Sequence, residues 1–210
     1  MPGHSLLCVS RSPCNFNEDN AAARADCDRG IRGHPGTGGT ATQDYTFMTS
    51  LQVNGRHGCG GSLINAQWVV TAAHCVAGQS ASQFQLRIGS RSRSSGGTLV
   101  RVSQIVQHPN YRGDVSGGYD IALMRLSQSV SNTPVTIAST SPAVNSGSRL
   151  LGWGQTCPQR GCDQGPDGLK QLDTRILPDS SCQTIVALRS YAGLRHPRPL
   201  RVVAQRVRRR

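Results

Sequence analysis

The stretch Thr71-Ala72-Ala73-His74-Cys75 closes an apolar run and places a histidine directly before a cysteine. Residues 67–71 and 60–64 predict the two strands of a hairpin around Asn65-Ala66. Upstream, apolar side chains at alternate positions of residues 47–53 predict a strand with one face buried. The quoted stretch therefore lies at the end of a β-strand, in a region of short strands.

Turn residues and further alternating segments continue this pattern along the chain. Asn54-Gly55 predicts a type I′ hairpin turn, because both central residues of that turn need a positive φ. Residues 83–88 and 99–106 alternate apolar and polar side chains on either side of a Ser- and Gly-rich loop, and residues 121–126 close the series. Short strands separated by turns indicate an all-β barrel or sandwich.

The second half of the chain carries fewer strand patterns. Residues 127–148 are rich in Ser, Thr, Pro and Asn and predict a connector between two domains. Beyond Cys182, apolar residues at every third position predict at most one short helix.

Five motifs stand out along the chain: Gly38-Gly39-Thr40, His57-Gly58-Cys59-Gly60-Gly61-Ser62-Leu63, the stretch quoted above, Asp120-Ile121-Ala122-Leu123 and Leu150-Leu151-Gly152-Trp153-Gly154. Together they resemble the chymotrypsin/trypsin family of serine endopeptidases, in a bacterial trypsin-like form. The histidine precedes the aspartate along the chain, which is the order in this family. The resemblance implies a chymotrypsin-like double β-barrel, with the first barrel complete at residues 45–130 and the second only partial. Residues 150–154 and 170–177 resemble the first two strands of that second barrel.

The extent of the resemblance divides the chain into three regions. Residues 1–36 have no periodicity and are expected to form a disordered leader. Residues 37–182 are expected to be the trypsin-like peptidase domain, incomplete at its C-terminal end. Residues 183–210 are expected to be an Arg-rich tail unrelated to the family.

The resemblance assigns roles to five residues. His74 matches the family's general base, which takes a proton from a serine hydroxyl and passes it to the leaving amine. Asp120 matches the buried aspartate that orients this imidazole. Cys59 and Cys75 match two cysteines that the family joins in a disulfide, and His57 matches a structural position.

The family's nucleophile is not found in the chain. The family places its serine in a Gly-Asp-Ser-Gly-Gly turn roughly ninety residues after the aspartate, and no such turn follows Asp120. Ser116 lies in a similar run, Gly113-Asp114-Val115-Ser116-Gly117-Gly118, but this run precedes Asp120 and is better explained as a Gly-rich turn. The oxyanion hole and the specificity pocket belong to the same missing region. We therefore expect a family member, a hydrolase by descent, that is inactive as written and truncated or frameshifted before the serine.

Cysteine content points to an extracellular location, which is also that of the family. Eight cysteines without a Cys-x-x-Cys pair fit a secreted disulfide-bonded protein better than a cytosolic one. The apolar patch of residues 6–9 is nevertheless shorter than the core of a signal peptide, about 7 to 15 residues. No apolar run approaches the roughly 20 residues of a membrane helix. The pairing of six cysteines stays open: Cys8, Cys14, Cys27, Cys157, Cys162 and Cys182.

The C-terminal tail supplies most of the net charge of +12, since residues 183–210 contain eight arginines and no acid. Three interpretations remain: translation in a shifted reading frame, a solvated tail without function, and an arm that contacts nucleic acid phosphates. Only Tyr191 could stack on a base, and no RNA-binding motif is present. These observations weigh against a nucleic-acid partner.

The motifs thus favour a serine endopeptidase lineage whose partners would be polypeptide substrates or protein inhibitors, with no cofactor and no metal. Two alternatives come from other classes. One is a non-catalytic binding protein built on the first barrel, with residues 84–88 as the contact surface. The other is a nucleic-acid binder that uses the basic tail.

Overall fold

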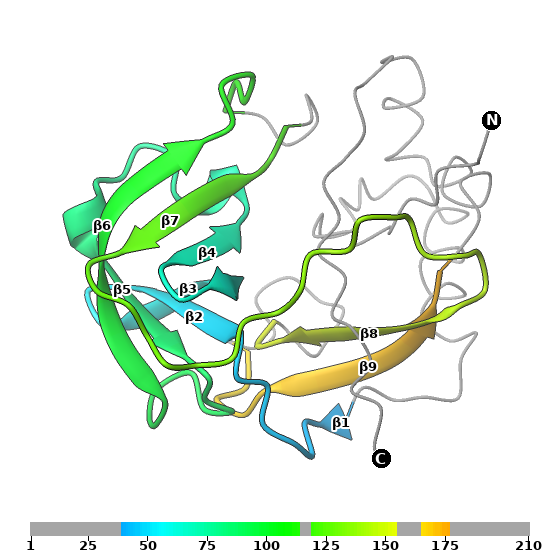
Figure 1. Cartoon of the computed structure of the whole chain (residues 1–210). Helices are drawn as coiled ribbons and strands as arrows, with labels where there is room; N and C mark the ends of the chain where they lie inside the picture. The colour runs from blue at the N-terminus through cyan, green and yellow to red at the C-terminus, as the bar shows by residue number, and fades with distance from the viewer. Residues whose placement is uncertain (1–38, 114–118, 155–164, 177–210) are drawn as a thin grey trace, which may run out of the picture.

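The computed structural model of the protein describes residues 39–113, 119–154 and 165–176 (Figure 1). Six strands close into a barrel in the order β2-β3-β4-β7-β6-β5, and three others form a separate sheet in the order β1-β9-β8. The predicted all-β fold, with one complete barrel beside a smaller sheet, is confirmed. The elements are β1 (Gly39–Thr40), β2 (Met48–Val53), β3 (Arg56–Asn65), β4 (Trp68–Thr71), the 3-10 turns η1 (Ala73–Cys75) and η2 (Ala81–Gln83), β5 (Phe84–Ile88), β6 (Thr98–Gln107), β7 (Ala122–Leu126), β8 (Gly147–Gly152) and β9 (Lys170–Arg175).

Local sequence determines the two hairpins that begin the barrel. Asn54 and Gly55 both have positive φ, 52° and 75°, as the predicted type I′ turn requires. In the next hairpin, Gly61 of β3 allows a close approach to β4. A Cβ at Gly61 would lie 2.9 Å from the carbonyl oxygen of Val70 and 2.9 Å from Cγ1 of Val69. Glycine is therefore required here by packing.

The barrel interior is filled by alternate side chains of its strands. In β5, Phe84, Leu86 and Ile88 are almost fully buried, whereas Gln85 and Arg87 are only half-buried. The alternative in which residues 84–88 bind a partner is therefore restricted to the outward side chains, because the other three belong to the core. The buried residues of this core are Leu51, Leu63, Val69, Ala73, Val76, Phe84, Leu86, Ile88, Val100, Val102, Ala122, Met124, Leu126 and Val130.

Strand β2 differs from its prediction, because both of its faces are buried. Ser50 and Gln52, on the face expected to meet solvent, are 0% and 2% exposed. The Gln52 Nε2 donates a hydrogen bond to the carbonyl oxygen of Arg93 (2.6 Å). On the same face Met48 belongs to a second apolar cluster with Trp153. The loop between β5 and β6 and the segment that follows β8 thus cover the outer side of this strand, which the local pattern of β2 could not reveal.

The small sheet is held by an ion pair across its two long strands. Arg149 of β8 pairs with Asp173 of β9 through two hydrogen bonds, Nε to Oδ1 (2.5 Å) and Nη2 to Oδ2 (2.7 Å). Arg149 also donates from Nη1 to the hydroxyl of Tyr45 (2.9 Å), which precedes the barrel. The guanidinium of Arg149 holds the pKa of the Asp173 carboxyl below its ordinary value.

We expect the Asp173→Asn variant to be less stable than wild type at neutral pH and equally stable in acid. Because the pKa of Asp173 is lowered in the folded state, its contribution is present above the unfolded pKa and is lost as the pH falls through the folded value. The side chain is 63% exposed, so solvent screening limits the difference to below about 1 kcal/mol. Urea unfolding at neutral pH and near pH 2 measures it. A difference of equal size at both pH values would contradict the prediction.

Candidate active site

The segment that follows β4 brings His74 to the rim of the barrel. Ala73 is fully buried, and it anchors the short turn η1 in the core. At the end of β4, Thr71 Oγ1 donates to the carbonyl oxygen of Gly60 (2.8 Å), which ties β4 to β3. The side chain of His74 is left 32% exposed. The imidazole is therefore accessible while the backbone that carries it is held in place.

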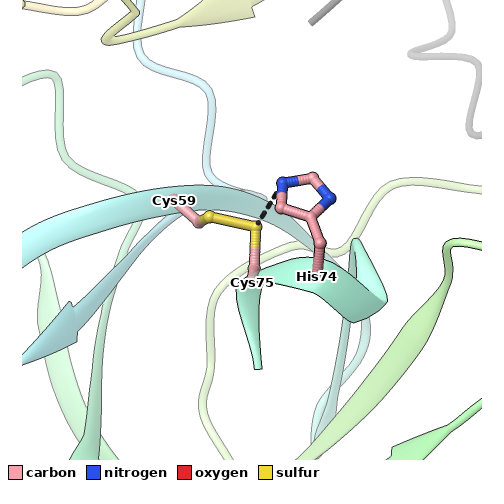
Figure 2. Close-up of side chains that lie close together, drawn as sticks. All are labelled: Cys59, His74 and Cys75. Carbon is pink, nitrogen blue, oxygen red and sulfur yellow. Dashed lines mark hydrogen bonds between the residues drawn. A yellow bond between two sulfur atoms is a disulfide. The ribbon is translucent and has the colours of Figure 1, made fainter. Parts of the chain in front are cut away.

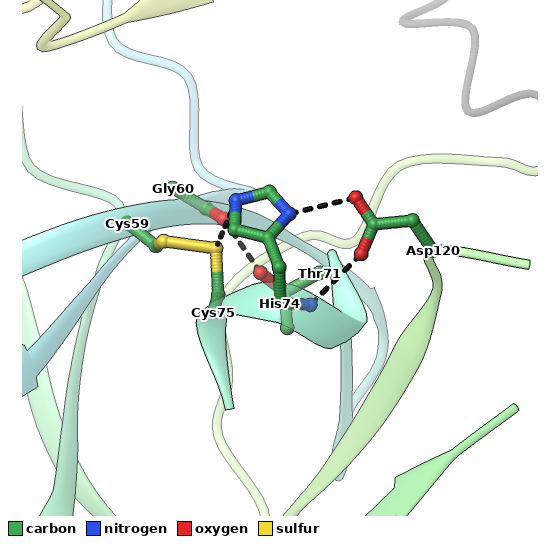
Figure 3. The surroundings of a disulfide bond; sticks show 6 residues. All are labelled: Cys59, Gly60, Thr71, His74, Cys75 and Asp120. Atoms are coloured by element: carbon green, nitrogen blue, oxygen red, sulfur yellow. Dashed lines mark hydrogen bonds and ion pairs between the residues drawn. A yellow bond between two sulfur atoms is a disulfide. The ribbon is translucent and has the colours of Figure 1, made fainter. Parts of the chain in front are cut away.

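A disulfide fixes the same turn to the barrel wall. Cys75 at the end of η1 is bonded to Cys59 of β3, with 6.1 Å between their Cα atoms (Figure 3). The two cysteines are 16 positions apart. The link joins η1 to the strand that also accepts the Thr71 hydrogen bond. Both attachments lie within a few residues of His74 and restrict the position of its ring.

Replacing Cys59 and Cys75 together by serine is expected to lower the free energy of unfolding by about 3 kcal/mol, because the open chain gains the entropy that closing a loop of this length removes. Urea denaturation without reductant measures the change. The dependence of the unfolding free energy on urea should stay the same or rise, because the barrel still buries its core and the unlinked unfolded chain exposes at least as much surface. An unchanged unfolding midpoint would show that the link does not stabilise the barrel.

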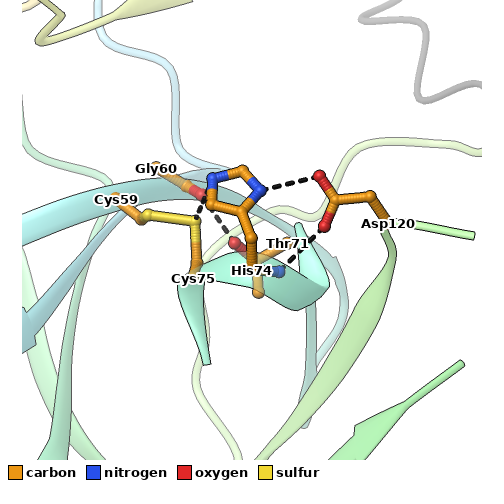
Figure 4. A network of polar contacts seen from close by, with 6 residues as sticks. All are labelled: Cys59, Gly60, Thr71, His74, Cys75 and Asp120. Atoms are coloured by element: carbon orange, nitrogen blue, oxygen red, sulfur yellow. Dashed lines mark hydrogen bonds and ion pairs between the residues drawn. A yellow bond between two sulfur atoms is a disulfide. The ribbon is translucent and has the colours of Figure 1, made fainter. Parts of the chain in front are cut away.

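Asp120 reaches His74 with both carboxylate oxygens. Oδ2 lies 2.7 Å from Nδ1 of the ring, and Oδ1 accepts a hydrogen bond from the backbone N–H of His74 (2.8 Å) (Figure 4). The carboxylate is 24% exposed. A carboxylate can only accept, so the imidazole donates from Nδ1 and, when neutral, keeps its lone pair on Nε2. The ring orientation and its tautomer are thereby both defined.

Strand register explains how two residues far apart in sequence meet. Thr71 of β4 pairs with Ala122 of β7 in an antiparallel ladder. His74 comes shortly after the first of these residues and Asp120 shortly before the second, so both leave the barrel at the same end. Tyr119, next to the aspartate, has a positive φ of 59° and stacks on His108, with ring centroids 4.7 Å apart.

The remaining ring nitrogen of His74 faces the disulfide. Nε2 lies 3.4 Å from Sγ of Cys75 (Figure 2). Sequence motifs gave no sign of this contact, because they place the histidine and the cysteine side by side without saying where either side chain points.

His57 belongs to a different group: its Nδ1 lies 2.7 Å from Oγ of Ser50, and its ring packs edge-on against Trp153 at 5.4 Å.

Several residues considered in the sequence lie outside the described residues. These are Ser116 and the six cysteines whose pairing the sequence left open. The proposed leader and the Arg-rich tail also fall there. Among the described residues, no helix is long and apolar enough to span a membrane.

Comparison with known proteins identifies the lineage of this fold and site. The family model of trypsin matches residues 36–191, which is most of the chain. This chain belongs to the trypsin family. Its resemblance to the chymotrypsin/trypsin-like serine proteases, inferred from the motifs, is thereby confirmed.

Individual trypsins also match this family member over part of its length. Trypsin beta of Drosophila erecta is 38% identical over 151 residues, and Trypsin alpha of Drosophila melanogaster is 36% identical over 151 residues. Each alignment covers 69% of this chain and 58% of the relative. Trypsin 5G1 of Aedes aegypti is 40% identical over 122 residues, or 54% of this chain and 45% of the relative. The chain thus spans little more than half the length of the trypsins it matches.

Proposed function

We propose that His74 and Asp120 are the general base and the orienting carboxylate of a serine-type endopeptidase site. The observation that carries this proposal is the 2.7 Å contact between Nδ1 of His74 and Oδ2 of Asp120 at the accessible rim of the barrel. In the mechanism established for this family, Nε2 takes the proton of a serine hydroxyl, and the aspartate stabilises the imidazolium that forms. The pair has the proton on Nδ1 and the lone pair on Nε2, as this chemistry requires.

We also propose that a polypeptide of these 210 residues does not hydrolyse peptide bonds. The sequence contains no Gly-Asp-Ser-Gly-Gly turn, and this turn supplies both the nucleophile and donors of the oxyanion hole in the family. Removing the triad leaves a residual acceleration of about 10³- to 10⁴-fold, but only when the oxyanion hole survives. Each lost donor raises the barrier further by about 2.7 to 4 kcal/mol.

Two measurements separate these two proposals. The purified 210-residue polypeptide should neither cleave a panel of peptide substrates nor react with a fluorophosphonate probe directed at serine nucleophiles. A chimera should gain activity when residues 37–182 are joined to the activation segment and the C-terminal segment of an active trypsin. Probe labelling of the polypeptide alone would disprove the proposal of inactivity. A chimera that folds but has no activity would contradict the proposal that His74 acts as a general base.

The hydrogen bond itself can be tested without the chimera. A proton on Nδ1 of His74 that is shared with Asp120 should give a low-field proton resonance in the wild-type polypeptide. The resonance should disappear in His74→Ala and in Asp120→Asn, and it should persist in His57→Gln, whose ring lies in another group. A spectrum that is the same for wild type and Asp120→Asn would contradict the pairing.

Location and partners follow from the same assignment. We propose that the protein acts outside the cell and contacts polypeptide substrates or protein inhibitors, with residues 37–182 as the peptidase domain. The Cys59–Cys75 disulfide supports this, since such bonds persist mainly in oxidising compartments.

A further inference from the structure

Three potential metal ligands converge beside the proposed base. The sulfur atoms of Cys59 and Cys75 and one ring nitrogen of His74 all lie within 4.8 Å of one another (Figure 2). Thiolate sulfur and imidazole nitrogen are the ligands that zinc prefers, usually in a tetrahedral arrangement. Three such atoms supply three corners of a tetrahedron and leave the fourth to water.

The imidazole is already arranged as a metal ligand. Asp120 accepts the hydrogen bond from Nδ1 at 2.7 Å, which leaves the lone pair of Nε2 on the side of the sulfurs. Ligating histidines in proteins commonly donate their other N–H to a carboxylate in this way. In a tetrahedral site with ordinary zinc bond lengths, a sulfur and a nitrogen are about 3.5 Å apart. Nε2 and Sγ of Cys75 are 3.4 Å apart.

The disulfide keeps this group from binding a metal, because neither sulfur is a thiolate. We propose that reduction of the Cys59–Cys75 bond converts the group into a site for a zinc-like divalent cation, held by both thiolates and Nε2 of His74. A reductant of the dithiol class gives two electrons and two protons to the two sulfurs and becomes a disulfide itself. The cation then displaces the two thiol protons to solvent. The sulfurs must move apart to about 3.8 Å to ligate it.

The exposed ring of His74 lets a cation reach the proposed site from solvent, and binding there would affect the proposed base. The side chain of His74 is 32% exposed, so a cation can reach Nε2 from solvent. A bound cation would occupy the lone pair that the proposed general base needs. His74 therefore cannot act as a base while the cation is bound. The metal site itself does not depend on whether His74 is a base. Metal binding can be measured whether or not the chain is a protease.

The test uses the full chain with its six other cysteines changed to serine, so that only Cys59 and Cys75 supply thiols. The protein is first reduced with a dithiol, and the dithiol is then removed under argon. The reduced protein is titrated with Co²⁺ and afterwards with Zn²⁺. We expect one equivalent of Co²⁺ to produce thiolate-to-cobalt charge-transfer absorption that Zn²⁺ abolishes. The oxidised protein should give no such signal.

Variants show whether the histidine and its carboxylate take part. Asp120→Asn, which removes the partner of the ligand, should weaken binding by about 10- to 100-fold. His74→Gln, which removes the imidazole ligand, should weaken it at least as much, whereas His57→Gln should bind as before. Circular dichroism checks that every variant keeps its strands. If the six-serine protein does not fold, the wild-type chain is reduced instead, and ¹⁵N resonances of labelled histidines report whether Zn²⁺ shifts Nε2 of His74. Equal affinity with and without His74, an unshifted Nε2, or no binding after reduction would overturn the proposal.

Discussion

In a chimera completed with the serine segment of an active trypsin, Asp120→Asn is expected to reduce kcat about 10⁴-fold, which is the scale of this exchange in the family. The structure gives a specific reason. The backbone N–H of His74 donates to Oδ1 of Asp120, and an asparagine there would keep its carbonyl oxygen as the acceptor. The amide NH₂ then takes the place of Oδ2 and faces Nδ1.

The consequence is a change of tautomer without a change of position. An NH₂ group donates, so Nδ1 must accept, and the proton of the neutral ring moves to Nε2. The base then has no lone pair for the serine. Steady-state kinetics on a peptide substrate measures the loss.

Asp167→Asn is the matched control, because this carboxylate accepts hydrogen bonds from Ser92 and Ser94 of the loop between β5 and β6, not from His74. Its kcat should change little. An equal loss of kcat in both variants would indicate general damage to the fold. An undiminished kcat in Asp120→Asn would remove Asp120 from the mechanism.

The second large effect concerns stability. Leu86→Ala is expected to lower the free energy of unfolding by about 2 to 5 kcal/mol. Leu86 is fully buried at the centre of β5, between the strands β2 and β6 that pair with it. The truncated side chain leaves a cavity that a closed barrel cannot easily fill, since every strand is held by a neighbour on both sides.

Gln85→Ala is the control for this variant. It changes the neighbouring position of the same strand, but its side chain points away from the core and is only half-buried. Its unfolding midpoint in urea should stay within about 0.5 kcal/mol of wild type after conversion to free energy. An equal loss of unfolding free energy in both variants would contradict the idea that only the inward-facing side chains of β5 stabilise the barrel.

Much of the barrel could be predicted because its elements depend on local pattern. The strands expected at residues 83–88, 99–106 and 121–126 correspond to β5, β6 and β7 with bounds shifted by at most one residue. Asn54-Gly55 forms the expected turn because its requirement for positive φ is a property of these two residues alone.

The outer face of β2 could not be predicted in the same way. Its polar residues alternate as they would on a solvated strand, yet Trp153, about a hundred positions later, packs on that side. The candidate site shows a similar limit. Motifs suggested His74 and Asp120 as partners, but the bond from the backbone N–H to Oδ1 involves a donor that every residue except proline possesses. The amino-acid sequence therefore cannot indicate this backbone hydrogen bond.

The pairing of β1 with β9 sets an order for assembly during translation. Gly39 pairs with Gln171 and Thr40 with Lys170, whereas the six barrel strands follow one another between residues 48 and 126. A nascent chain can close the barrel while β9 is still inside the ribosome. The segment at β1 must wait for more than a hundred further residues before its partner emerges. A ribosome that stalls after β7 has left its exit tunnel, but before β9 has, would therefore carry a formed barrel whose leading strand β1 is still unpaired.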